Sequence, residues 1–256
     1  MNKSMLAAAA ITIASASPVL AADLPLKAVE PLPPFTWTSC YAGGHVGGAW
    51  AQKDVTDPVQ LVQDGFLGLG TTVGVTTVTA QPTGLVLGGQ IGCDYQFFPS
   101  WVAGFEGAAS ASYMKGSASA ALPLGFAGDQ ETLTIHTDLI PSFTARFGFA
   151  ADRALFYVKG GAAWASDKYS LVGTFQGTGF DFEGLSLRAG WTAGAGVEWA
   201  VWDDWSVRLE YDYYDFGHSN VLMSDSVNVL SGPVDVKQTV QAVKLGLNFH
   251  VWSGGW

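Results

Sequence analysis

Residues 205–213 read WSVRLEYDY, and residues 243–251 read VKLGLNFHV. In both segments apolar or aromatic residues occupy every second position, with polar, charged or glycine residues between them, and residues 187–199 (LRAGWTAGAGVEW) follow the same pattern. Successive side chains of a strand point to opposite faces, so each segment has one apolar and one polar face. The charged face does not suit a protein core, and the aromatic face is too long to lie in water. A transmembrane β-barrel satisfies both faces.

The alternation predicts eight strands, over residues 37–50, 85–98, 101–113, 134–149, 154–166, 185–201, 204–217 and 236–251. Their connections differ in length on the two sides. The short connections are 98–100, 150–153 and 202–204, and the long ones cover about 51–84, 114–133, 167–184 and 218–235. Outer-membrane barrels have short periplasmic turns and long extracellular loops. We therefore predict an all-β fold, an eight-stranded antiparallel transmembrane up-and-down β-barrel.

The N-terminus has the pattern of a secretory signal peptide. Lys3 supplies a positive charge, residues 5–13 are apolar, and residues 19–21 (VLA) form a cleavage site. The apolar run is far shorter than the roughly 20 residues of a spanning helix. We predict a signal peptide over 1–21, a Pro-rich periplasmic lead over 22–36, the barrel over 37–251 and a C-terminal tail over 252–256.

Composition and motifs exclude several functions. The chain has 12 basic and 22 acidic residues, a net charge of −10, which argues against nucleic acid as a partner. The sequence contains no phosphate loop, metal-ligand cluster or nucleophile elbow. His218 and Ser219 are adjacent in a predicted strand and would point to opposite faces, so they do not form the catalytic pair of an outer-membrane lipid A deacylase. We expect neither enzymatic activity nor a bound metal.

Charged residues on the polar faces of the strands should point into the barrel. An unpaired charge in so narrow a lumen costs several kcal/mol, so these residues should pair across it. Two roles are open: the network plugs the barrel, or Arg208 exchanges carboxylate partners and gates a narrow ion path. His45 and His250 also face the lumen. The predicted charges are Asp94, Glu106, Arg146, Lys159, Arg188, Glu198, Arg208, Glu210, Asp212 and Lys244.

Lysines and aromatics fall at opposite ends of the predicted strands. Lys53, Lys115, Lys168 and Lys237 lie where strands meet the long loops. We hypothesise that they form a ring that binds lipopolysaccharide phosphates; the alternative is that they snorkel to the membrane boundary. At the other ends, a periplasmic aromatic girdle is predicted from Trp37, Tyr41, Tyr95, Trp101, Phe147, Trp199 and Trp205.

The two cysteines, Cys40 and Cys93, fall near the periplasmic ends of neighbouring predicted strands, both on the lipid face. The periplasm is oxidising, so a disulfide can persist there. The sequence leaves a cross-strand disulfide and two buried thiols equally open.

Several motifs resemble known outer-membrane proteins. Residues 194–199 (GAGVEW) and 208–211 (RLEY) resemble the sixth and seventh strands of OmpA-type barrels. Residues 22–25 (ADLP) and 35–44 (FTWTSCYAGG) resemble the small outer-membrane proteins of alphaproteobacteria, which include immunogenic surface antigens and haemin-binding proteins. Residues 215–217 (DFG) and 246–249 (GLNF) fit the same group. Two features depart from it: Cys40 replaces a usual aromatic, and residues 253–256 extend past the usual end.

This resemblance implies a location in the outer membrane of a Gram-negative bacterium, reached through the periplasm. It implies an internal charge network at Glu106, Arg146, Glu198 and Arg208. It also implies a signal for the barrel-assembly machinery, carried by Lys244, Gly246, Phe249 and Val251. Haem binding follows by analogy alone, with the outward His136 and His218 as candidate ligands, and no other cofactor is expected.

The function predicted from the sequence is non-enzymatic. It is support of envelope integrity, together with surface interactions of four extracellular loops with an unidentified partner. A narrow channel is the alternative, and an outer-membrane enzyme ranks third.

Overall fold

The computed structural model describes residues 35–56, 77–121, 128–225 and 230–253. The predicted signal peptide, most of the Pro-rich lead, residues 57–76 of the first connection and the last three residues lie outside this part of the chain. Within it, no helix is both long and apolar enough to span a bilayer.

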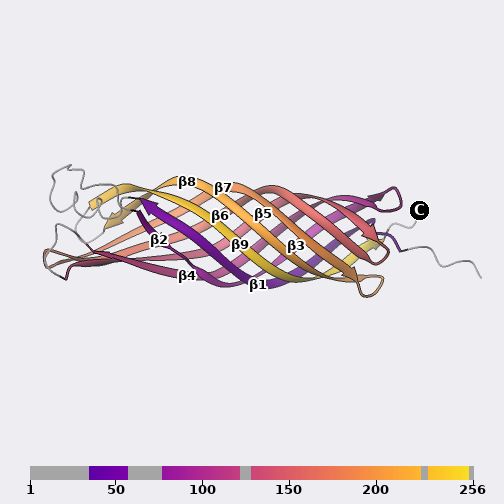
Figure 1. Cartoon of the computed structure of the whole chain (residues 1–256), viewed down its shortest axis with the longest axis horizontal. Helices are drawn as coiled ribbons and strands as arrows, with labels where there is room; N and C mark the ends of the chain where they lie inside the picture. The colour runs from indigo at the N-terminus through magenta and orange to yellow at the C-terminus, as the bar shows by residue number, and fades with distance from the viewer. Residues whose placement is uncertain (1–34, 57–76, 122–127, 226–229, 254–256) are drawn as a thin grey trace, which may run out of the picture. The chain divides into compact units, whose positions relative to one another are not determined.

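The described residues form antiparallel strands that wind obliquely around one barrel (Figure 1). The strands are β1 (Ser39–Thr56), β2 (Thr77–Ala80), β3 (Thr83–Phe97), β4 (Trp101–Ala121), β5 (Gln130–Ala151), β6 (Ala154–Phe175), β7 (Thr178–Ala200), β8 (Trp205–Asp225) and β9 (Leu230–Ser253). Neighbours pair in the order β1-β3-β4-β5-β6-β7-β8-β9, and β1 also pairs with β9. This closes a ring of eight strands, as the alternation predicted.

Strands β2 and β3 pair with successive parts of the same edge of β1. Strand β2 pairs with the outer part of β1, where Lys53 faces Ala80, and only Gln81 and Pro82 separate it from β3. The nitrogen of Ala51 donates to the carbonyl oxygen of Pro82 at 2.8 Å. Proline has no N–H to donate, which accounts for the break in the ladder between β2 and β3.

The strands are longer than the sequence predicted. Three turns connect them at one end, which we call the turn end, and these match the predicted short connections. At the opposite loop end, β6 runs to Phe175 and β7 begins at Thr178, so the predicted long loop 167–184 is wrong. It is a two-residue hairpin turn at Gln176 and Gly177, whose φ angles of 49° and 79° suit a type I′ turn. Strands also include residues 51–56, 77–80 and 83–84 of the first predicted loop, 114–121 and 130–133 of the second, and 218–225 and 230–235 of the fourth.

The physical reason lies in a reversal of polarity along the strands. Near the loop end most apolar side chains point inward, although Val172, Leu185 and Leu222 are exposed. The outward residues there include Ser117, Thr132, Lys168, Asp181 and Glu183. A search for the membrane pattern reads such segments as loops. We call the buried cluster inside this part the distal core: Val55, Ala80, Leu133, Ile135, Tyr169, Leu171, Phe175, Phe180, Phe182, Val221, Met223, Val234 and Val236.

Two further apolar layers fill the barrel below the distal core. The middle layer contains Ala49, Ala51, Val86, Met114, Ile140, Ala163, Ala165, Tyr214, Phe216, Val240 and Ala242. The turn-end layer contains Trp37, Val102, Ala150, Leu155, Tyr157 and Ala200. The lumen is therefore packed with side chains at several levels.

The outer surface carries an apolar band between two aromatic belts. At the turn end Tyr95, Trp101, Phe147, Trp199 and Trp205 are exposed, as predicted. Nearer the loop end a second belt, the outer belt, consists of Trp50, Tyr113, Trp164 and Trp191. Between them the exposed residues include Ile91, Phe105, Phe143, Val158, Leu209 and Leu247.

Trp37 and Tyr41 do not belong to the girdle, and that prediction is wrong. Both are buried inside the barrel, with 1% and 2% of their surface exposed. Trp37 precedes β1 and its indole N–H donates to the carbonyl oxygen of Asp152 at 3.2 Å, at the turn end. Tyr41 is next to the outward Cys40, so strand alternation directs it inward.

Candidate functional site: the charged lumen and the outer lysines

The centre of the lumen holds a network of buried charges. Arg208 of β8 donates a hydrogen bond to Glu106 of β4, which lies on the opposite wall. Arg146 of β5 pairs with Glu198 of β7 at 2.8 Å and lies 3.6 Å from Glu106. The structure thus brings together the four residues that the family resemblance singled out, all of them buried.

Lysines extend this network toward the loop end. Lys159 Nζ lies 2.7 Å from Glu210, 3.2 Å from Glu106 and 3.2 Å from Asp212. Lys244 pairs with Asp212 at 2.7 Å and donates to the hydroxyl of Tyr214 at 2.7 Å. Asp94, on the other side, lies 3.3 Å from Arg146. Nine of the ten predicted lumen charges therefore belong to one connected cluster, which we call the central network.

Neutral groups that the sequence analysis missed complete the central network. The hydroxyl of Tyr41 donates to Glu106 at 2.8 Å and accepts a hydrogen bond from Arg146. Tyr157 donates to Glu210 at 2.8 Å, and the Arg146 guanidinium lies 4.1 Å from the centre of the Tyr157 ring. Strand parity alone would have placed both tyrosines inside the barrel.

The two inward histidines lie in the lumen, as predicted, and their hydrogen-bond partners are uncharged, while His250 Nε2 also lies 3.8 Å from Glu198. His45 Nδ1 lies 2.6 Å from Gln90 Oε1, and its Nε2 lies 2.8 Å from Ser110. His250 lies between Ser39 at 2.7 Å and Ser206 at 2.9 Å. These contacts leave neither histidine poised as a metal ligand.

Arg188 and Lys53 form a second polar cluster, away from the central network. Lys53 Nζ pairs with Asp167 at 2.6 Å and donates to Thr137 at 3.0 Å. Arg188 Nε lies 3.8 Å from Asp167, and its other nitrogens donate to the carbonyl oxygen of Val236 and the hydroxyl of Tyr169. We call this group the Lys53 cluster. The prediction that Arg188 joins the main network is wrong, because Arg188 precedes Glu198 on β7 and lies nearer the loop end.

The prediction that Lys53 belongs to an outward lysine ring is also wrong. Its side chain is fully buried. Lys53 follows Ala49 and Ala51 at alternate inward positions of β1, which continues beyond the predicted end at residue 50. The other three lysines, Lys115, Lys168 and Lys237, are exposed on the outside of the barrel.

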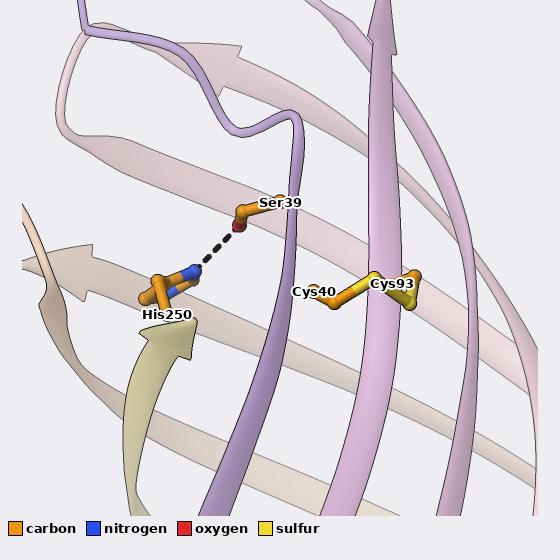
Figure 2. The surroundings of a disulfide bond; sticks show 4 residues. All are labelled: Ser39, Cys40, Cys93 and His250. Atoms are coloured by element: carbon orange, nitrogen blue, oxygen red, sulfur yellow. Dashed lines mark hydrogen bonds between the residues drawn. A yellow bond between two sulfur atoms is a disulfide. The ribbon is translucent and has the colours of Figure 1, made fainter. Parts of the chain in front are cut away.

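Cys40 and Cys93 are joined by a disulfide between β1 and β3, with a Cα–Cα distance of 3.9 Å. They are directly opposed in the strand register. Figure 2 shows Cys40 directed toward Cys93 while the preceding residue, Ser39, points toward His250. The bond therefore lies on the outside of the barrel wall, next to the seam where β1 meets β9.

The residues predicted as an assembly signal divide between the two faces of β9. Lys244 and Gly246 point inward, whereas Phe249 and Val251 are 40% and 61% exposed. A Cβ atom on Gly246 would lie 2.9 Å from Arg208 Cγ. The glycine therefore makes room for Arg208, which is a structural requirement in addition to any recognition of this strand.

The two outward histidines lie on different walls. His136 is on β5 and His218 is on β8, where its Nδ1 contacts Asp235 at 2.8 Å. These strands are not neighbours in the ring, so nothing in the described residues brings the two together as a pair of ligands.

Glu131 is an isolated carboxylate beyond the outer belt. It lies inside the barrel on β5, and 1% of its surface is exposed. Neither carboxylate oxygen has a hydrogen-bond partner among the described residues. Burial raises the pKa of the Glu131 carboxyl to about 7.

Comparison with known proteins agrees with this architecture. Residues 6–249 match the family model described as the outer membrane protein beta-barrel domain. The chain is 29% identical to the 31 kDa outer-membrane immunogenic protein of Brucella melitensis over 252 residues, which cover 95% of this chain and 96% of that protein. It is 26% identical to the 25 kDa outer-membrane immunogenic protein of Brucella abortus over 221 residues, covering 86% and 82%.

A solved structure shows the same kind of fold. The outer-membrane protease OmpT from Escherichia coli superposes with a TM-score of 0.52 at 10% identity, covering 86% of this chain and 99% of that one. At this identity the likeness concerns the fold alone. Taken with the family match over most of its length, the closed antiparallel ring with its lipid-facing band identifies the chain as a member of the outer membrane protein beta-barrel family, a surface protein of the bacterial outer membrane.

Proposed function

We propose that this protein is a closed, non-enzymatic scaffold of the outer membrane, which supports envelope integrity and presents its extracellular end for surface interactions. The observation that carries the proposal is the filling of the lumen. Polar and apolar layers follow one another along the barrel, from the turn-end layer through the central network to the distal core.

The charges of the central network support a plug. Each of Glu106, Arg146, Glu198 and Arg208 contacts at least one opposite charge, so the network joins facing walls. A buried pair that loses one partner leaves an uncompensated charge, which is strongly destabilising. Arg208 spans the lumen to Glu106, and its Nη1 also lies 3.8 Å from Glu210.

The apolar layers argue against a narrow channel in a different way. An ion that passed the central network would meet the middle layer and then the distal core. Moving an ion into such surroundings without partners costs several kcal/mol or more. A switch of Arg208 between Glu106 and Glu210 would leave both layers in place.

The extracellular end supports the role in surface interactions. Short turns of such barrels face the periplasm, so the loop end faces outward. Beyond the outer belt the barrel continues with an apolar interior and a polar exterior, including Thr132, Lys168 and Glu183. This part holds the connections above the membrane on a rigid base. Of the four loops that the sequence predicted, the third is a tight turn, and strands take up part of each of the other three.

Single-channel conductance of the folded mature protein in planar bilayers, at two salt concentrations, tests the proposal. We expect no reproducible steps from wild type. The variant Arg208→Glu reverses a charge in the network, and Arg153→Glu reverses one in an exposed pair with Asp203 as the matched control. Folding of each is checked by heat-modifiable migration on gels. Steps in wild type that change with Arg208→Glu but not with Arg153→Glu would replace the proposal with a gated channel.

A further inference from the structure

The outward lysines are not spread evenly around the barrel. Lys115 of β4 and Lys168 of β6 flank His136 of β5, and the strand register places Lys115 opposite His136 and His136 opposite Lys168. All three point outward. Adjacent strands lie about 4.8 Å apart, so the three side chains form one row of potential hydrogen-bond donors.

A pocket of about 240 Å³ lies at one end of this row. Its lining includes Tyr113, Lys115, His136 and Asp138. Irregular pairing produces it: Ser112 and Tyr113 of β4 together face Asp138 alone, and Asp138 has no partner on β6 between Thr137 and Leu139. Bulges of this kind redirect side chains and occur near functional sites.

The charges of the row leave it open to an anion. Asp138 Oδ2 lies 2.7 Å from Lys168 Nζ and so holds that lysine beside the pocket. Within the described residues Lys115 makes no ion pair and the His136 ring makes no hydrogen bond. Two lysines against one carboxylate give the site a net positive charge. Charge-assisted bonds from such donors to phosphate oxygens are short and strong.

The position of the row relative to the membrane points to a lipid. Tyr113 and Trp164 of the outer belt lie just below it on β4 and β6, at the level where headgroups meet hydrocarbon. Below the pocket the outward residues of β4 are Ala111, Ala109 and Gly107. These small side chains project little from the strand, so an acyl chain can lie along β4 beside Phe143 of β5.

From the row, the pocket and the small residues below them, we propose that Lys115, His136 and Lys168 form a binding site for a phosphate of lipopolysaccharide in the outer leaflet. The ligand is a phosphorylated lipid whose phosphate contacts the row and whose chains descend along β4. This inference deepens the proposed function, because it names a partner by which a closed scaffold supports the envelope, and it rests on that proposal.

Lys237 provides the internal contrast. It is also exposed, and its register partners are His218 and Asp54. Asp235 contacts His218 at 2.8 Å, so two carboxylates accompany this one lysine. The local charge is negative and does not favour phosphate. Lys237→Gln is therefore a matched control that removes an outward lysine from the same level of the barrel.

The experiment is native mass spectrometry of the folded mature protein in detergent, titrated with bisphosphorylated lipid A, with dephosphorylated lipid A, or with inorganic phosphate. We expect wild type and Lys237→Gln to retain bisphosphorylated lipid A. The triple variant Lys115→Gln/His136→Gln/Lys168→Gln should bind it at least about tenfold more weakly, since charge-assisted contacts are lost. Dephosphorylated lipid A should bind weakly to all three proteins.

Three outcomes would overturn the inference: equal retention by the triple variant and wild type, equal binding of both lipids, or saturation by inorganic phosphate at the same concentration as lipid A. All substitutions lie on the outer surface, and heat-modifiable migration verifies folding. If wild type shows no conductance steps and also fails to retain bisphosphorylated lipid A, the lipid site is refuted and the closed scaffold is not. Conductance steps would refute the closed scaffold whatever the lipid result.

Discussion

Arg208 and Glu106 are joined across the lumen although β8 and β4 are four strands apart in either direction around the ring. Lys53 and Asp167 have the same relationship, because β1 and β6 are also opposite walls. Two cross-braces therefore connect facing walls at different heights. The lower one lies within the membrane band and the upper one lies just beyond Trp50 of the outer belt. Each spans the lumen where it lies and connects the strands that carry it.

Removing Arg208 should lower the free energy of unfolding far more than removing an exposed arginine. In Arg208→Met, Glu106 loses the hydrogen bond from Arg208 while it stays buried and keeps Lys159 at 3.2 Å, so we expect a loss of about 3 kcal/mol in the free energy of unfolding, the lower end of the range for a broken buried pair. Arg153→Met removes an arginine whose pair with Asp203 is exposed, and should cost less than about 1 kcal/mol. Urea unfolding of the refolded mature protein, followed by the gel shift, measures both. Equal losses would show that the network contributes little to stability.

Much of the lower brace was predictable from sequence, whereas the upper brace was not. Glu198 and Arg208 stand in long alternating segments whose polar face has to be the lumen. Lys53 stands beyond the point where the outward residues become polar, and there the membrane pattern predicts a loop instead of the observed strand. Strand parity predicts an inward Tyr41, because Cys40 faces the lipid and adjacent strand residues point to opposite faces. The position of an aromatic residue near a strand end instead suggests the girdle, and parity is the better guide here.

We predict that replacing Lys53 lowers the stability of the barrel without changing the amount of lipopolysaccharide that co-purifies with it. Lys53→Met leaves Asp167 buried beside Arg188 at 3.8 Å, and we expect a loss of about 3–5 kcal/mol. Lys237→Met, on the outer surface, should change stability by less than about 0.5 kcal/mol. In the fraction of Lys53→Met that folds, lipopolysaccharide co-purification should equal that of wild type. Reduced co-purification in folded protein would instead return Lys53 to the outer rim.

The disulfide should stabilise the barrel through the unfolded chain. Cys40 and Cys93 are 53 residues apart in sequence. Closing a loop of that length lowers the entropy of the unfolded chain and so raises its free energy by about 4 kcal/mol. The variant Cys40→Ser/Cys93→Ser should therefore unfold at lower urea concentration than wild type. Reductant should lower the wild-type midpoint to that of the variant and leave the variant unchanged. A wild-type midpoint that is the same with and without reductant would contradict a stabilising bond.

Glu131 predicts how stability varies with pH. Burial raises its pKa in the folded protein to about 7, from an ordinary value of 4.5. Between these values the folded state holds a proton that the unfolded chain has released, so stability falls as the pH rises through this interval. The loss amounts to about 3 kcal/mol once the pH exceeds the folded pKa.

The variant Glu131→Gln tests this prediction, because it carries no charge at any pH. When urea unfolding of the two proteins is compared, the free energy of unfolding of Glu131→Gln should equal that of wild type near pH 4.5. At pH 8 it should exceed the wild-type value by about 3 kcal/mol. The other titrating groups are common to both proteins and cancel in the difference. A difference that is the same at both pH values would mean that the carboxylate is hydrated in the folded barrel rather than enclosed by the distal core.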